Sequence, residues 1–212
     1  MLDVLRKLNK GKDRSVLIGR NALNFHYNVL SMKQKNILRT QDFDLLCPDV
    51  DTANECRDIL ESVGFEKRLG TFFHPKTGEI DIVLADQEFP TESVVGGYFN
   101  LHGLRELWDA RENNNGVIVP NIDCLIMNKL LFMRENEGKD AETIGIYFSF
   151  NPERLDSVID KIVSHGNTDR RDKMLYSLYE GVSHSGVFKQ KVELVILNDI
   201  ERQKFKENEP RK

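Results

Sequence analysis

Residues 39–45 have the sequence Arg39-Thr-Gln-Asp-Phe-Asp-Leu45, in which Asp42 and Asp44 stand on either side of one phenylalanine. The apolar residues that alternate with them and follow them predict a short β-strand, which Pro48 ends before a helix over about residues 52–63. Because side chains alternate across a strand, Asp42 and Asp44 project from the same face. Two carboxylates placed this close favour a shared hard cation, so the segment predicts a strand with a divalent-metal site. The alternative is a solvated strand face or a turn, where most Asp-x-Asp pairs of acidic proteins lie.

The segment upstream predicts a strand, a tight turn and a helix. Residues 16–18 form the apolar run Val-Leu-Ile, Gly19 follows it, and apolar residues then recur at helical spacing from Ala22 to Leu30. A glycine between a strand and a helix exposes backbone N–H groups at a helix N-terminus, where phosphate binds well. The alternative for Gly19 is an ordinary turn glycine.

A third carboxylate lies downstream. Residues 65–73 and 79–84 flank the turn-rich spacer His74-Pro-Lys-Thr-Gly78 and predict a β-hairpin, whose second arm carries Asp81. Asp81 completes a carboxylate cluster if this arm pairs beside the strand of Asp42. A cluster of this kind suits phosphoryl chemistry, in which metal ions hold the phosphates and stabilise the attacking and leaving oxygens.

The chain changes character near Pro120. Before it, the run Asn113-Asn-Asn-Gly116 predicts a loop ahead of a short strand over residues 117–119. After it, helical patterns begin at Pro120-Asn121 and recur further on, over about residues 152–164, 171–180 and 189–200. We therefore expect an α/β domain over residues 1–119, a helical part over residues 120–200, and a charged tail over residues 201–212 that frays or is solvated.

Length and composition narrow the class of protein. The 212 residues suffice for a core without disulfides or structural metal, and the three cysteines have no disulfide or zinc spacing. The N-terminal segment lacks the apolar run of a signal peptide, and we expect a soluble protein of the reducing cytosol with no membrane partner. A formal net charge of -4 gives no sign of a general nucleic-acid binder.

Three segments together resemble the nucleotidyltransferase superfamily, in particular its minimal abortive-infection type. They are Leu17-Ile-Gly-Arg-Asn-Ala-Leu23, Arg39-Thr-Gln-Asp-Phe-Asp-Leu45 and Glu79-Ile-Asp-Ile-Val83, which agree with the family in order and spacing. The resemblance implies a small mixed β-sheet domain followed by helices. It also implies that Gly19 binds nucleotide phosphates, that Asp42, Asp44 and Asp81 bind Mg²⁺ or Mn²⁺, and that the last of them helps to activate the attacking hydroxyl.

The resemblance extends more loosely into the helical part, and covers about residues 15–145. The family places a lysine, an arginine and a Lys/Arg-Asp pair there, which look like Lys129, Arg134 and Lys139-Asp140. The resemblance thereby implies that Lys129 and Asp140 contact the nucleotide. The alternative for Lys129 is a solvated lysine beside the apolar face of its helix. The function implied is transfer of a nucleoside monophosphate from an NTP, such as ATP, to an acceptor hydroxyl.

Two departures from the family pattern bear on phosphate binding and on catalytic activity. Arg20 stands where the family has a serine or second glycine, and Thr143 stands where it has a further acidic residue. Arg20 either supplies a charge to the triphosphate or marks a catalytically inactive nucleotide-binding or regulatory protein of the same fold. A third interpretation of Arg20 is a solvated arginine at a helix start.

A metal-dependent nuclease is less favoured by the sequence. Residues 137–139, Glu-Gly-Lys, resemble a nuclease element, but we expect them at a helix end rather than on a strand beside Asp81. The five histidines have no metal-ligand spacing and are expected to be packed or at the surface, and the aromatic segment 146–150 and Trp108 are expected in the core. The acceptor, whether RNA, protein or small molecule, and an antitoxin-like partner are left open.

Overall fold

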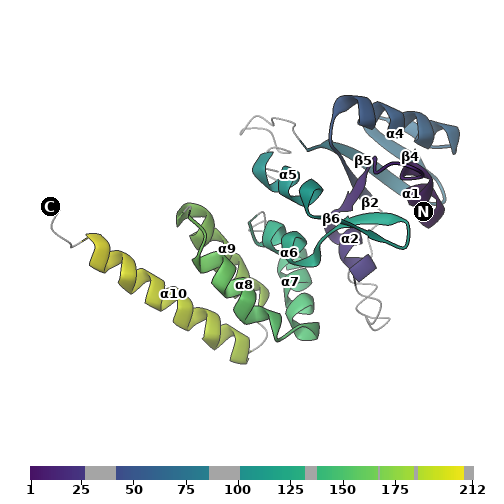
Figure 1. The fold of residues 1–212 in the computed structure, drawn as a ribbon. Coiled ribbons are helices and arrows are strands. Elements are labelled where there is room, and N and C mark those ends of the chain that lie inside the picture. The colour runs from purple at the N-terminus through teal and green to yellow at the C-terminus, as the bar shows by residue number, and fades with distance from the viewer. Residues whose placement is uncertain (27–41, 86–100, 132–137, 167, 184–185, 208–212) are drawn as a thin grey trace. The chain divides into compact units, whose positions relative to one another are not determined.

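The structure is a computed structural model that describes residues 1–26, 42–85, 101–131, 138–166, 168–183 and 186–207. The chain forms two compact units, Met1–Asn128 and Lys129–Lys212. The first contains the strands and the second is helical (Figure 1).

The first unit contains both helices and strands. They are α1 (Leu2–Leu8), β1 (Val16–Ile18), α2 (Gly19–His26), β2 (Asp42–Cys47), α4 (Val50–Ser62), β3 (Glu66–Arg68), β4 (Thr71–His74), β5 (Gly78–Leu84), α5 (Leu101–Asp109), β6 (Arg111–Asn114) and β7 (Val117–Pro120). Helix α6 (Ile122–Leu131) crosses from the first unit into the second.

The main sheet has the strand order β1-β2-β5-β4-β3. Strands β2 and β5 are parallel, and the other neighbouring pairs are antiparallel. A parallel pair requires a crossover connection, which begins here with α4. The expected α/β class with a small mixed sheet is therefore confirmed.

Helix α4 and the sheet bury a common apolar core. The helix begins after Asp49, whose side chain accepts a hydrogen bond from the Thr52 N–H at 2.7 Å and so satisfies one of the open donors of the first turn. The side chains that pack beneath the helix and within the sheet are fully buried. Among them are Leu17, Leu45, Leu60, Phe72 and Ile80.

Two local expectations differ from the structure. The first arm of the expected hairpin folds as two strands, β3 and β4, because Leu69 and Gly70 form a turn with φ of 46° and 98°. The loop expected over residues 113–116 is shorter than predicted, since β6 pairs with β7 through a turn at Asn115 and Gly116. The predicted first arm contained β3 but not the turn after it, whereas the polar side chains of β6 concealed that strand from the apolar pattern.

The second unit consists of α7 (Gly138–Phe150), α8 (Arg154–Val163), α9 (Thr168–Gly181) and α10 (Gly186–Glu207). The last three were expected from periodicity, whereas periodicity did not reveal α7. Within α7, Tyr147 and Phe148 are buried as expected of the aromatic segment, and Phe150 is exposed. Trp108 of α5, in the first unit, is buried as expected. None of the helices in the described ranges combines the length and apolarity needed to cross a membrane.

Candidate active site

The sheet register places the predicted aspartates on neighbouring strands. Asp44 of β2 is the direct partner of Asp81 of β5, and Asp42 is the partner of Glu79. Directly paired residues of adjacent strands share a face, and residues two apart on one strand share it as well. Asp42, Asp44, Glu79 and Asp81 therefore lie on one face of the sheet, as expected for the three aspartates.

Gly19 brings the backbone of the strand-to-helix turn against Asp44. Ile18, the last residue of β1, is the antiparallel partner of Asp44, and Gly19 follows with φ of 69°. A Cβ at Gly19 would lie 2.7 Å from the Oδ2 atom of Asp44. Glycine is thus required here for two reasons, the left-handed backbone and the close approach of a carboxylate.

Asn21 ties the same helix to the strand of the aspartates. Its buried side chain donates a hydrogen bond from Nδ2 to the backbone oxygen of Asp42 at 2.8 Å. This bond joins the first turn of α2 to the start of β2. Asn21 was missed at the level of sequence, because an asparagine in a first helical turn is common and its partner lies 21 residues away.

The carboxylates influence one another electrostatically. The pKa of Asp81 is raised from its ordinary value, first by burial and then by the negative charges of Glu79 and Asp42. Like charges held together disfavour ionisation, and a bound cation removes that penalty. The sequence motif contains Glu79 without assigning it a role, and its alignment with Asp42 adds a fourth carboxylate to this face.

The side chains as they stand do not complete a metal site. Within the described part of the chain, no group of three or more histidine, cysteine, aspartate or glutamate side chains has the geometry to hold a metal ion. The donor set still suits a hard divalent cation, since it is made of carboxylates whose mutual repulsion such an ion would relieve. Metal binding at Asp42, Asp44 and Asp81 therefore stays a prediction.

Arg20 follows Gly19 directly in the first turn of α2. Its side chain is half-buried, and its guanidinium forms no ion pair with another residue in the ranges that the structure describes. A cation beside the turn at Gly19 is placed to attract an anion.

Lys129 and Asp140, the two nucleotide-binding candidates of the helical part, contact each other. The Nζ atom of Lys129 donates to Oδ1 of Asp140 at 2.7 Å, and the side chains are 20% and 8% exposed. Two elements, α6 and α7, are joined by this ion pair. Arg134 and the side chain of Lys139 lie outside the described residues.

Thr143, the departure from the family pattern, is fully buried on α7. A carboxylate at such a position would have to be desolvated, which costs several kcal/mol unless it is paired. The smaller, uncharged threonine avoids that cost. Glu137 of the nuclease-like element lies outside the described residues, and residues 138 and 139 begin α7, at a helix end as expected.

Two histidines of the first unit pack against other residues of the protein. The Nε2 atom of His26 lies 2.8 Å from the backbone oxygen of Pro120, and the ring of His74 lies 5.1 Å from that of Phe65. These contacts are structural. His184 and the side chain of His102 lie outside the described residues.

Comparison with known proteins yields matches to solved structures only. No protein-family model matches the chain, and no curated protein matches its sequence. One similar structure is that of an H. pylori protein described as a candidate nucleotidyltransferase, with 11% identity, a TM-score of 0.44, and coverage of 92% of this chain and 94% of that one. Another is JHP933 from Helicobacter pylori, with 12% identity, a TM-score of 0.39, and coverage of 95% and 94%.

Proposed function

We propose that this protein is a metal-dependent nucleotidyltransferase that moves a nucleoside monophosphate from an NTP to an acceptor hydroxyl. The observation that carries the proposal is the contact of the Gly19 turn with Asp44, the partner of Asp81 in the sheet register. A turn suited to phosphate and two carboxylates thus meet at one place, as transfer of a nucleoside monophosphate to a hydroxyl requires.

The carboxylates have distinct roles in this proposal. Asp42 and Asp44 would hold Mg²⁺ or Mn²⁺, which when bound neutralises charge on the phosphates and on the leaving pyrophosphate. Asp81, which the sequence resemblance also implies as a metal ligand, would accept the proton of the acceptor hydroxyl. Burial, the first cause of the raised pKa of Asp81, supports this role, since a carboxylate with increased proton affinity is a better general base.

The cationic residues bind the nucleotide. Arg20 contacts the triphosphate beside the Gly19 turn, and a charge-assisted hydrogen bond of this kind is worth about 1 to 3 kcal/mol. The sequence resemblance assigns Lys129 and Asp140 to the nucleotide as well. Their ion pair holds the ammonium group of Lys129 in one orientation.

Transfer of label from each of the four NTPs tests the proposal. With Mg²⁺ present, we expect one labelled NTP to label cellular RNA, protein or a small molecule and to release pyrophosphate. Asp44→Asn should lower this transfer by about 100-fold or more, the scale of losing a group that stabilises charge in the transition state. The matched control is Asp58→Asn, the same change on the exposed surface of α4, which should leave transfer unchanged.

The second candidate is an inactive nucleotide-binding or regulatory protein of the same fold, which the presence of Arg20 favours. In that case the wild type binds an NTP in calorimetry but transfers nothing. Arg20→Ser should then create transfer if the arginine blocks the phosphate site. If the wild type does transfer label, and Arg20→Ala weakens that transfer, this candidate is excluded. If Asp44→Asn and the wild type bind NTP and metal equally well, both candidates are wrong.

A further inference from the structure

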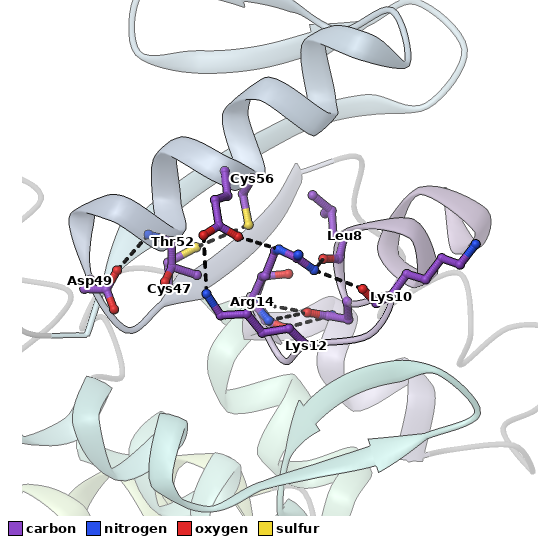
Figure 2. Close-up of polar contacts among 11 residues, drawn as sticks. Leu8, Lys10, Lys12, Arg14, Cys47, Asp49, Thr52 and Cys56 are labelled. Atoms are coloured by element: carbon purple, nitrogen blue, oxygen red, sulfur yellow. Dashed lines mark hydrogen bonds and ion pairs between the residues drawn. The ribbon is translucent and has the colours of Figure 1, made fainter.

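Two of the three cysteines lie side by side in the first unit, although they are 9 positions apart in the chain. Cys47 is the last residue of β2 and Cys56 lies in α4 (Figure 2). Their Sγ atoms are 3.8 Å apart, and both side chains are fully buried. A disulfide bond needs a separation of about 2 Å, so a shift of less than about 2 Å would join them.

The two thiols have different electrostatic surroundings. The pKa of Cys56 is lowered, first by the hydrogen bond with Cys47 and then by the positive charge of Arg14. The pKa of Cys47 is raised by the same hydrogen bond and by burial. Cys56 is therefore the thiol that more readily becomes a thiolate, the form that reacts with oxidants, and Cys47 keeps its proton.

Two ion pairs lie next to Cys56 and concern the access of reagents to its sulfur. Arg14 and Lys12, from the loop before β1, both bond the carboxylate of Glu55, the neighbour of Cys56 in α4, at 2.7 and 3.3 Å. Arg14, Lys12 and Cys56 are labelled in Figure 2. These ion pairs are partly or largely exposed, and such pairs stabilise a fold only weakly. Both sulfurs are fully buried, so a reagent reaches them only through a local opening, which can be far smaller for hydrogen peroxide than for a bulky reagent.

We propose that Cys47 and Cys56 are a reversible disulfide site that reacts with a small peroxide such as hydrogen peroxide. The Cys56 thiolate attacks one peroxide oxygen, the O–O bond breaks, and the sulfur becomes a sulfenic acid while the other oxygen leaves as hydroxide and takes a proton to form water. The sulfur of Cys47 then attacks that of Cys56, its proton goes to the departing hydroxyl, and a second water leaves. Two thiols are oxidised and one peroxide is reduced to two waters.

The test uses the full chain with Cys124→Ser, which removes the half-exposed third cysteine. After treatment of the folded protein with hydrogen peroxide, both remaining thiols should disappear together and the mass should fall by two hydrogen atoms. A peptide map should show one bond between residues 47 and 56, and dithiothreitol should restore both thiols. Before peroxide treatment, a bulky aromatic disulfide reagent should label neither thiol in the folded protein.

The matched control is Cys56→Ser in the same background, in which peroxide can add oxygen to Cys47 but cannot form the internal bond. A peptide map of the peroxide-treated wild type repeats the test without any substitution, in case a variant does not fold. The proposal is overturned if Cys47 and Cys56 stay free thiols, if each gains oxygen without joining the other, or if they join only between molecules.

Discussion

Gly19 has a left-handed backbone and lies close to the carboxylate of Asp44, and these two features can be tested separately. Gly19→Ala strains the turn at φ of 69° and places a Cβ 2.7 Å from Oδ2 of Asp44. We expect the free energy of unfolding to fall by about 1 to 3 kcal/mol, and Mn²⁺ binding to weaken because Asp44 must move. Urea unfolding and calorimetry measure the two effects.

Gly11→Ala is the control for this substitution. Gly11 has φ of 78°, but a Cβ there would meet no atom within 4 Å. It should therefore lose stability through backbone strain alone and bind Mn²⁺ as the wild type does. Equal results for the two variants would show that the contact between Gly19 and Asp44 contributes nothing.

The raised pKa of Asp81 predicts how stability depends on pH. Because the folded state binds this proton more tightly than the unfolded state, the free energy of unfolding falls as pH rises from the ordinary pKa of 3.8 through the raised value. In metal-free buffer at neutral pH, Asp81→Asn should be more stable than the wild type. The difference should vanish below pH 3.8, where the carboxyl is protonated in both states.

Urea unfolding over a series of pH values, with a chelator present, measures this difference. Added Mn²⁺ should stabilise the wild type and not the variant, if Asp81 is a ligand. If the variant is instead less stable than the wild type at neutral pH without metal, favourable contacts stabilise the charged carboxylate of Asp81 and outweigh the repulsion.

At the scale of elements, the contact of α7 with α9 depends on glycine for packing. A Cβ at Gly181 would lie 2.4 Å from Cγ2 of Ile144, and a Cβ at Gly145 would lie 2.7 Å from the backbone oxygen of Gly181. The absence of side chains at these two positions lets the helices approach closely. We expect Gly181→Ala to lower the free energy of unfolding by about 1 to 3 kcal/mol, as overpacking does.

A double-mutant cycle with Ile144→Ala isolates that contact. Ile144→Ala alone should cost about 2 to 5 kcal/mol through the cavity it leaves. Together the two substitutions should cost less than their sum, because the alanine removes Cγ2, the closer of the two clashing atoms, and leaves only its Cβ, 2.7 Å from the added Cβ. Gly166→Ala is the control, since a Cβ there meets nothing within 4 Å. If the free-energy changes of the two single variants add up to that of the double variant, the helices have moved apart instead of clashing.

Elements with a regular apolar pattern were predictable, and those without one were not. Periodicity located β1, β2 and α4 in the first unit and α8 to α10 in the second. It missed β6, whose residues Arg-Glu-Asn-Asn are all polar, and α7, whose run of residues 144–150 is apolar on most sides. A pattern that is polar or apolar all round carries no period, so only pairing and packing decide the structure there.

At the scale of the whole molecule, we expect the two units to respond differently to a bound metal ion and to a nucleotide. Mn²⁺ alone should raise hydrogen-exchange protection in β1, β2 and β5, which adjoin Gly19 or carry the aspartates, because a ligand stabilises what it binds. Protection in α7 to α10 should not change. An NTP added with Mn²⁺ should also protect the helices of Lys129 and Asp140, if they contact the nucleotide. Equal protection of both units by Mn²⁺ alone would contradict a metal site confined to the sheet.

The sequence by itself determined the features that depend on neighbouring residues. Strand alternation puts Asp42 and Asp44 on one face, and a glycine between a strand and a helix marks the turn at Gly19, because both follow from local backbone geometry. The order of the segments and the helical second half were readable for the same reason.

Only the tertiary structure decided which distant residues meet. The register of Asp44 with Asp81, the bond from Asn21 to the Asp42 backbone and the approach of Cys47 to Cys56 each join separate elements. A shift of one residue between β2 and β5 would turn Asp81 to the opposite face with no change in either strand's own pattern. Such contacts are selected by the packing of the whole sheet against its helices, and no local propensity encodes that choice.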